Sequence, residues 1–462
     1  MTLRMFGSAL ALFALGGSAL AQQPQPQPQS RLVPQPPAPR PATPLPAAPR
    51  MRMPANALLP ATQALFDGYV RDGKMPGIVG AFGVGDFPTL FVTAGHIADG
   101  ADAARADADS LWRVYSMTKP LTAMAAMLLI QDGKIRLDQP LSDFFPAFKT
   151  MRVLTSPDTS LASVPARHPI LIRNLLTHTA GLGYSIITKG PLLHEYERLG
   201  ILPGVIDAKS EAQARLVRPK TLAAFANRVA TLPLIAEPGT KWSYSIGLDV
   251  MGAVIEKASG MPFDRFVNTR IFAPLKMTSS YWTVPASEAG RLATDYAFVG
   301  DTRVPIDAGR TSVWLSPPTF PYGGAGLVMS ARDYDRFLHM LQDGGTLEGV
   351  QVARPETIAL MMSNLLPAGV TFGGIGGGTG GTQGATPMGF GAGGSVFLAD
   401  GPGGFPGKGT YGWGGAAGTI AFVDPAHRSR TTVMVNYMPP EKWPLRADLA
   451  HALAADTARF GR

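Results

Sequence analysis

The sequence Ser-Met-Thr-Lys at residues 116–119 places a hydroxyl and an amine three positions apart, just before the strongly apolar segment 121–130. Residues i and i+3 lie on one face of a helix, so the Lys119 amine would approach the Ser116 hydroxyl. Apolar surroundings would favour a neutral amine that can act as a base, and a helix N-terminus would stabilise a developing oxyanion. The spacing predicts a serine nucleophile activated by lysine. The alternative is a capped helix start whose lysine extends to solvent.

Two segments far along the chain could complete such a site. Tyr244 lies in a predicted turn before a helix expected at residues 249–258, and its hydroxyl could face a cleft from there. Near the C-terminus, Trp413 is followed by Gly414, Gly415 and Ala416, small residues that let a backbone approach a ligand and expose an N–H as an oxyanion donor. Each segment alone is better explained as structural, by a core tyrosine and a tightly packed strand. Their occurrence together with the Ser-x-x-Lys pattern favours a catalytic set.

Other catalytic patterns are missing from the sequence. It contains no Gly-x-Ser-x-Gly elbow, no cysteine, and no metal-ligand spacing among its seven histidines. The sequence therefore predicts neither a metal nor an organic cofactor.

The chain resembles the penicillin-recognising serine hydrolases with the class C β-lactamase and penicillin-binding-protein-like fold, and among them it looks most like the family VIII carboxylesterases. The motifs that carry the resemblance, in the family's order, are Arg-Val-Tyr-Ser-Met-Thr-Lys-Pro at 113–120, Ile-Arg-Asn-Leu-Leu-Thr-His-Thr-Ala-Gly-Leu at 172–182, Tyr-Ser-Ile at 244–246, Gly-Ala-Gly-Leu at 324–327 and Trp-Gly-Gly at 413–415. The likeness extends from about residue 58 to residue 460.

The resemblance implies a role for each of these segments. Ser116 would be the acylated nucleophile, and Lys119 and Tyr244 would share the general-base and proton-return steps. The N–H groups of Ser116 and Ala416 would form the oxyanion hole. Which of Lys119 and Tyr244 is the base stays open, because a protonated lysine beside a tyrosine also favours the phenolate. His178, although part of a family motif, is expected to be structural.

Two departures from the family pattern bear on the substrate. The β-lactamases and D-alanyl carboxypeptidases of the family usually have asparagine at the position of Ile246, and lysine or histidine at the position of Trp413. Ile246 cannot bind a substrate amide, and Trp413 offers an apolar wall and one N–H donor in place of a cation for a carboxylate. The specificity is therefore expected to shift from anionic peptide-like substrates toward neutral esters.

The pattern of apolar residues predicts an α/β fold of the α+β kind, in which an antiparallel sheet formed by the N- and C-terminal segments is flanked by helices. A mainly helical lobe is expected as an insertion at about residues 135–325. Strands are expected at residues 78–94, 388–398, 411–423 and 431–437, and helices at 58–73, 117–131, 173–176, 221–230, 249–258, 331–341 and 448–460. Ser330 and Asp333 resemble a capping box, and the glycine-rich segment 372–386 is expected to be a flexible surface loop.

The N-terminal residues indicate export. Residues 1–21 combine a short basic start, an apolar stretch and an Ala-Leu-Ala cleavage site, as in a secretory signal peptide. Residues 22–56 are rich in proline, glutamine and alanine and are expected to form a disordered linker ahead of a hydrolase domain at 57–462. Residues 1–56 also hold five arginines and no acid, so the net charge of +8 is mostly confined to this tail. We therefore expect a bacterial periplasmic or secreted protein that binds neither nucleic acid nor, through a stable anchor, a membrane.

These features lead to one function and two alternatives. The main prediction is an exported serine hydrolase that cleaves small carboxylic esters, or transfers their acyl groups, through an acyl-enzyme on Ser116. The first alternative is a β-lactamase or D-alanyl-D-alanine carboxypeptidase. The second is a non-catalytic binder of peptidoglycan or acyl groups, which would have no need to retain Ser116, Lys119 and Tyr244.

Overall fold

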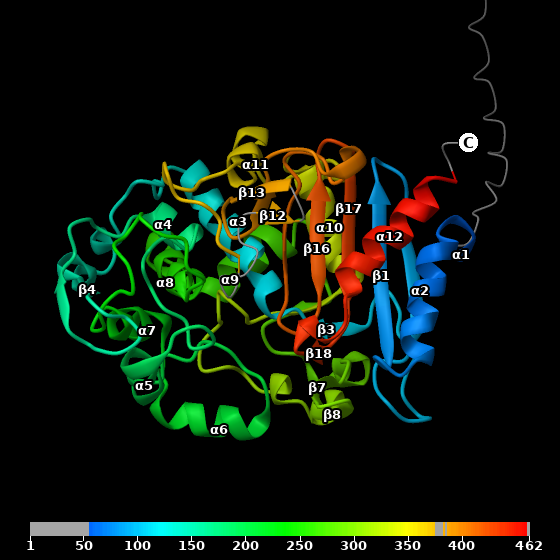
Figure 1. The fold of residues 1–462 in the computed structure, drawn as a ribbon, viewed down its shortest axis with the longest axis horizontal. Coiled ribbons are helices and arrows are strands. Elements are labelled where there is room, and N and C mark those ends of the chain that lie inside the picture. The colour runs from blue at the N-terminus through cyan, green and yellow to red at the C-terminus, as the bar shows by residue number, and fades with distance from the viewer. Residues whose placement is uncertain (1–54, 375–381, 384–385, 460–462) are drawn as a thin grey trace, which may run out of the picture. The chain divides into compact units, whose positions relative to one another are not determined.

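An antiparallel sheet of eight strands, in the order β12-β13-β14-β15-β16-β17-β1-β2, forms the centre of the fold (Figure 1). The computed structural model describes residues 55–374, 382–383 and 386–459. The strands of this sheet are β1 (Gly77–Val84), β2 (Leu90–Gly95), β12 (Thr382–Gln383), β13 (Thr386–Phe390), β14 (Ser395–Phe397), β15 (Tyr411–Gly414), β16 (Ile420–Asp424) and β17 (Ser429–Met434). The first hairpin of the described chain is thus completed by its last strands, which confirms the predicted sheet.

Strand β1 joins the two ends of the chain because it pairs with β2 on one side and with β17 on the other, where Val79 lies opposite Met434. Side chains of a strand alternate between the faces of a sheet. Ile78 and Phe82 accordingly belong to one apolar cluster, whereas Val79 and Ala81 belong to another. Nearly all of β1 is buried, so the strand requires helices on both faces of the sheet.

The two terminal helices, α2 (Pro60–Arg71) and α12 (Leu445–Thr457), pack on each other and on the β1–β2 side of the sheet (Figure 1). The buried carboxylate of Asp456 accepts hydrogen bonds from the backbone N–H and the hydroxyl of Thr62 at 2.9 and 2.7 Å. Helix α10 (Ala331–Gln342) packs on β1, β16 and β17, and its buried apolar residues belong to the same apolar cluster as Val79 and Ala81.

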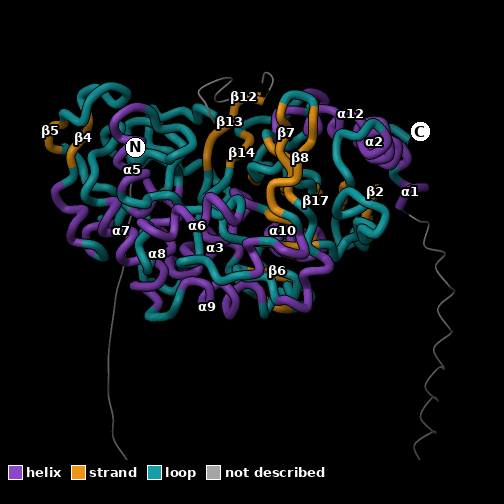
Figure 2. Tube along the Cα trace, turned by 90° about the horizontal axis from the view of Figure 1, so that it is seen from below, coloured by secondary structure: helices purple, strands orange, loops and turns teal. Residues whose placement is uncertain are grey.

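The middle of the chain supplies six of the twelve α-helices that the structure describes and few strands, as expected of the predicted helical lobe. These helices lie beyond the β13 side of the sheet in Figure 1, and Figure 2 shows the same separation from below. They are α4 (Ile172–Leu176), α5 (Gly190–Arg198), α6 (Ala208–Val217), α7 (Leu222–Val229), α8 (Gly247–Ser259) and α9 (Phe263–Val267).

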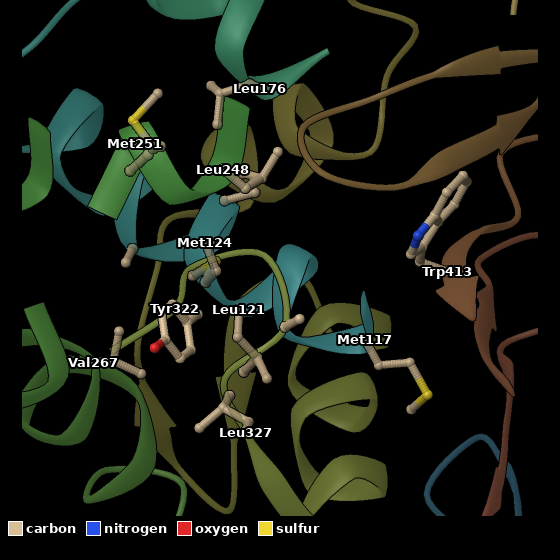
Figure 3. Packing of buried hydrophobic residues seen from close by; sticks show 14 of the residues in the cluster. Met117, Leu121, Met124, Leu176, Leu248, Met251, Val267, Tyr322, Leu327 and Trp413 are labelled. Carbon is tan, nitrogen blue, oxygen red and sulfur yellow. The ribbon is translucent and has the colours of Figure 1, made fainter. Parts of the chain in front are cut away.

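Helix α3 (Thr118–Gln131) is the apolar centre of the molecule, because its residues from Thr118 to Leu129 are all buried. Figure 3 shows Met124 of this helix beside Leu248 and Met251 of α8, with which it shares the large apolar cluster. A helix that is buried on every side has few alternative positions, so α3 is a rigid base for the residues at its N-terminus.

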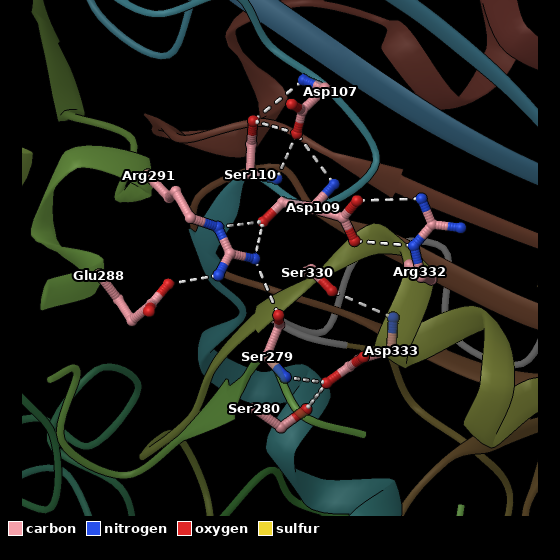
Figure 4. Close-up of polar contacts among 10 residues, drawn as sticks. All are labelled: Asp107, Asp109, Ser110, Ser279, Ser280, Glu288, Arg291, Ser330, Arg332 and Asp333. Carbon is pink, nitrogen blue, oxygen red and sulfur yellow. Dashed lines mark hydrogen bonds and ion pairs between the residues drawn. The ribbon is translucent and has the colours of Figure 1, made fainter. Parts of the chain in front are cut away.

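The start of α10 differs from the predicted capping box. Ser330 Oγ accepts a hydrogen bond from the Asp333 N–H at 3.1 Å, as expected of an N-cap. The Asp333 carboxylate does not return to the N-cap backbone, because it accepts hydrogen bonds from the Ser279 N–H at 2.6 Å and the Ser280 hydroxyl at 2.8 Å (Figure 4). Asp333 therefore connects α10 to β6 (Ser280–Tyr281), a contact between residues more than fifty positions apart.

Two segments expected to be single strands are hairpins. Residues 388–398 contain part of β13 and all of β14, and residues 411–423 contain β15 and part of β16. Residues 391–394 and 415–419 are rich in glycine and form the turns, which the apolar residues on either side obscured. The segment 431–437 likewise ends β17 and begins the separate strand β18 (Tyr437–Met438).

The remaining elements are short. They are α1 (Ala55–Leu58), α11 (Pro355–Met361), β3 (Leu111–Arg113), β4 (Arg152–Leu154), β5 (Ser163–Pro165), β7 (Asp295–Val299), β8 (Thr302–Asp307), β9 (Val328–Ser330), β10 (Thr346–Leu347) and β11 (Val350–Gln351). Within the described ranges, no helix combines the length and the apolar character needed to cross a membrane. The predicted signal peptide, nearly all of the predicted linker and most of the glycine-rich segment lie outside the described residues.

Candidate active site

Ser116 lies in a single 3-10 turn, Tyr115–Met117, between the buried strand β3 and the buried helix α3. Tyr115 has a φ of 42°, in the left-handed region that residues with a side chain rarely adopt. Its hydroxyl donates a hydrogen bond of 2.5 Å to Asp295, and burial, followed by the charge of Asp295, raises the Tyr115 pKa well above its usual value. The hydrogen bond from Tyr115 to Asp295 thus fixes the turn that carries Ser116.

The strand before this turn is fixed by a buried ion pair. The Arg113 guanidinium donates to Asp307 through Nε at 3.1 Å and to the Ser312 hydroxyl through Nη2 at 2.9 Å. The Arg113 side chain is completely buried and that of Asp307 is 4% exposed. If either Arg113 or Asp307 were removed, the other would keep a buried charge without its ion-pair partner, close to the turn that carries Ser116.

The Lys119 side chain is fully buried and points from the first turn of α3 toward Ser116. Its Nζ donates to Ser116 Oγ at 3.1 Å and to the Gly324 carbonyl at 2.7 Å. Nζ also lies 4.6 Å from the centre of the Tyr244 ring. The structure thus brings the Lys119 amine and the Ser116 hydroxyl of the Ser-x-x-Lys pair within hydrogen-bond distance of each other.

Tyr244 completes the contact from a turn before α8. Its hydroxyl donates to Ser116 Oγ at 2.7 Å and accepts a long contact of 3.4 Å from Trp413 Nε1. The ring is 2% exposed and is surrounded by other aromatic rings, with the centroids of His178 and Tyr184 at 4.8 and 5.4 Å. Ser116, Lys119 and Tyr244, separated by up to 128 positions, therefore meet at one oxygen.

His178 is placed behind this group. The ring Nδ1 accepts a hydrogen bond from the Ser245 N–H at 3.2 Å and lies 2.9 Å from the Ser245 hydroxyl. Burial, followed by the positive charge of Lys119, lowers the His178 pKa well below its usual value, so the ring is neutral. A neutral acceptor beside Tyr244 fits the structural role expected of His178.

The segment 413–416 lies against the nucleophile turn. A Cβ on Gly415 would be only 2.5 Å from the Val114 carbonyl oxygen, so a glycine is needed at this close approach. Ala416 is exposed, and its N–H donates no hydrogen bond to any residue that the structure describes. Gly415 thus lies against Val114, two residues before Ser116, and Ala416 follows Gly415 directly. The oxyanion role of the Ala416 N–H stays a prediction.

The other predicted specificity residue, Ile246, is placed differently. Its side chain is fully buried in the apolar cluster, at the N-cap of α8, so in this conformation it presents no surface to a ligand. Trp413 is 6% exposed and contacts Tyr244 directly. Of the two residues that depart from the family pattern, Trp413 is therefore the one that contacts the Tyr244 hydroxyl.

Three residues at this site were not singled out from the sequence as site residues. Gly324 provides the carbonyl that binds Lys119, and Asp249 accepts a hydrogen bond from the Gly324 N–H at 2.8 Å. Tyr184 places its ring 5.5 Å from Lys119 Nζ. Gly324 lay in a family motif, whereas an acidic residue in an otherwise apolar helix turn was the one signal for Asp249.

The chain belongs to the beta-lactamase family, whose family model matches residues 62–455. It is 33% identical to an uncharacterized protein of Mycobacterium tuberculosis over 75% of this chain and 82% of the relative. It is 30% identical to the esterase EstB of Burkholderia gladioli over 62% of this chain and 71% of that protein. The solved structure of EstCE1, described as a hydrolase with promiscuous acyltransferase activity, shares the fold with a TM-score of 0.67, at 24% identity over 86% of this chain and 98% of that chain.

Proposed function

We propose that the protein is a serine hydrolase that cleaves carboxylic esters, or transfers their acyl groups, through a covalent intermediate on Ser116. The observation that carries the proposal is the meeting of Lys119 Nζ and the Tyr244 hydroxyl at Ser116 Oγ, at 3.1 and 2.7 Å. The esterase EstB, a relative of this chain, and the hydrolase EstCE1, which shares its fold, agree with this chemistry.

The proposed reaction has two stages. Ser116 Oγ attacks the ester carbonyl while its proton passes to Lys119 or Tyr244, and the same proton returns to the departing alcohol. Water or a second alcohol then attacks the acyl-enzyme and restores Ser116. The N–H groups of Ser116 and Ala416 are proposed to bind the oxyanion, because they belong to segments that lie against each other.

The substrate is proposed to be a small neutral ester. Trp413 contacts Tyr244, the hydrogen-bond partner of Ser116, with an apolar indole and one N–H, so position 413 offers no cation for a substrate carboxylate. Trp413 itself supplies no charge to offset the hydration that a carboxylate would lose there. The lack of a cation at position 413 disfavours the β-lactamase and carboxypeptidase alternatives.

Export remains part of the proposal. The sequence of residues 1–21 supports it, and the mature chain would begin at Gln22. N-terminal sequencing of the protein recovered from a bacterial periplasm or culture medium tests this point. A chain that keeps Met1 and stays in the cytoplasm would contradict it.

The function is tested with the purified protein on p-nitrophenyl esters of increasing acyl length, with nitrocefin as the β-lactam. We expect hydrolysis of the short esters and its loss in Ser116→Ala. Ser287→Ala, which removes an exposed hydroxyl elsewhere in the chain, is the matched control and should keep full activity. Faster turnover of nitrocefin than of any ester would establish the β-lactamase alternative. A folded protein that turns over neither substrate class would favour the binder.

A further inference from the structure

A buried carboxyl group lies directly behind the proposed catalytic lysine. Asp249, in the first turn of α8, has a fully buried side chain. Its Oδ1 accepts the hydrogen bond from the Gly324 N–H, but its Oδ2 is buried with no hydrogen-bond partner among the described residues. A buried carboxylate oxygen that lacks a donor is costly, so such a group calls for an explanation.

Gly324 connects this carboxyl to Lys119. The N–H of Gly324 points to Asp249 and its carbonyl accepts the 2.7 Å hydrogen bond from Lys119 Nζ. A Cβ on Gly324 would lie 2.6 Å from Asp249 Oδ2, so the carboxyl packs directly against this backbone. The N–H and the carbonyl of Gly324 belong to adjacent peptide units joined at its Cα. Because both units are tightly packed, a bond at Gly324 N restrains the backbone that presents the Gly324 oxygen.

Asp249 and Lys119 also interact through their charges. Burial raises the Asp249 pKa to about 7, while the positive charge of Lys119 and the hydrogen bond from Gly324 oppose that rise. With a pKa of about 7, Asp249 changes its charge near neutral pH, and both its side chain and that of Lys119 are fully buried in the interior of the protein. Interactions between charges are stronger there than at the surface.

Few other ionisable groups share this environment. Lys119 faces Asp249 from α3, and Tyr184 faces it from the segment that follows α4. Tyr244, before α8, packs against Tyr184. His178, which is neutral, lies on the far side of Tyr244. The charged residues on α4, α7, α9 and the rest of α8 are all at least partly exposed, and they are Arg173, Arg228, Glu256, Lys257, Asp264 and Arg265.

We propose that Asp249 is a positioning residue for Lys119: it fixes the Gly324 carbonyl that orients the amine, and its ionisation sets the pH at which the Ser116 site becomes active. The inference rests on the proposed function, because it concerns the same nucleophile. The charges of Asp249 and Lys119 interact in the interior of the protein, so an ionised Asp249 opposes the loss of a proton from the Lys119 amine. Removal of the negative charge is therefore expected to move the acid side of the pH profile to lower pH.

The test compares three variants by the pH dependence of kcat/KM on a short p-nitrophenyl ester. Asp249→Asn keeps an oxygen for the Gly324 N–H and removes the charge, so we expect its acid limb to lie about one pH unit lower. Asp249→Ala also removes the hydrogen bond, so its kcat should fall by about 100-fold through misplacement of Lys119. Asp456→Asn changes another fully buried carboxyl, remote from the site between α2 and α12, and should leave the profile unchanged.

The outcome is decisive in either direction. A profile of Asp249→Asn that superimposes on that of the wild type overturns the inference, even if the variant is less stable. If the wild type cleaves no ester, the proposed function fails separately. The inference is then tested by the pH dependence of fluorophosphonate labelling of Ser116, with the same expected shift.

A second measurement covers a variant that fails to fold. In protein labelled with ¹³C at the aspartate carboxyls, we expect one resonance to titrate near neutral pH. Its midpoint should rise in Lys119→Gln, because the positive charge that favours the carboxylate is gone. A neutral-range midpoint that Lys119→Gln leaves unchanged, or the absence of any such resonance, would overturn the inference.

Discussion

Replacement of Tyr244 by phenylalanine is the sharpest test of how the site moves its proton. The change deletes the hydroxyl that donates to Ser116 Oγ at 2.7 Å and keeps the ring, which is 2% exposed and packed among aromatic neighbours. A side chain that transfers a proton in the transition state contributes about 10²- to 10⁴-fold to the rate. We therefore expect kcat/KM on a short ester to fall by a factor in that range while the fold is retained.

A comparison with Trp413→Phe separates proton transfer from simple packing. This variant removes the indole N–H whose contact with the Tyr244 hydroxyl is 3.4 Å long. A single neutral hydrogen bond has a net value of about 0.5–1.5 kcal/mol, which corresponds to a rate change of about tenfold at most. Tyr69→Phe, the same substitution in a buried tyrosine on α2, should leave kcat/KM unchanged.

The assay is the initial rate of p-nitrophenol release over a range of substrate concentrations, with thermal unfolding recorded for each variant. Proton transfer by Tyr244 is refuted if folded Tyr244→Phe keeps more than about a tenth of the wild-type kcat/KM, because the loss would then be no greater than that of one ordinary hydrogen bond. Tyr244 would in that case support Ser116 without moving its proton.

Two further predictions concern stability and are both checked by urea unfolding. Asp307→Ala leaves Arg113 buried without its ion-pair partner and should lower the free energy of unfolding by about 3–5 kcal/mol. Asp301→Ala, at an exposed ion pair, should change the free energy of unfolding little. Equal losses of stability in the two variants would contradict the importance assigned to the buried pair. Because the folded-state Asp249 pKa of about 7 lies above the ordinary value near 4, its contribution to stability is lost as pH rises between these values, by up to about 4 kcal/mol. The stability of Asp249→Asn relative to the wild type should therefore rise over this range, and parallel pH curves would exclude the buried carboxyl as the cause.

Local patterns were sufficient to predict the sheet and the nucleophile turn. The helix at 118–131 is apolar nearly along its whole length, and β1 is apolar and buried along nearly its whole length, as a strand with helices on both faces of its sheet must be. The Ser116–Lys119 contact needs only one helical turn, so its spacing was visible in the sequence. Tyr244 is different, because its position beside Ser116 depends on the whole helical lobe and was expected mainly from family resemblance.

Other features depend on contacts that no local pattern contains. The hydrogen bond between Asp249 and Gly324 joins residues 75 positions apart, and Asp333 left its expected capping role for Ser279 and Ser280, more than fifty positions away. Both acids pair with backbone or hydroxyl groups that only the folded chain brings near. The hairpins at 388–398 and 411–423 were predicted as single strands because of a local signal. The apolar residues on either side of their glycines indicated a strand more strongly than the glycines indicated a turn.

The central claim is that Ser116 is the nucleophile, and covalent labelling tests it most directly. The purified protein is treated with a fluorophosphonate, its intact mass is measured, and the modified peptide is mapped by mass spectrometry. We predict one phosphonyl group per chain, on Ser116, with loss of ester hydrolysis in proportion to labelling and no label in Ser116→Ala. A label on another residue, or ester hydrolysis that continues in fully labelled protein, would contradict this assignment.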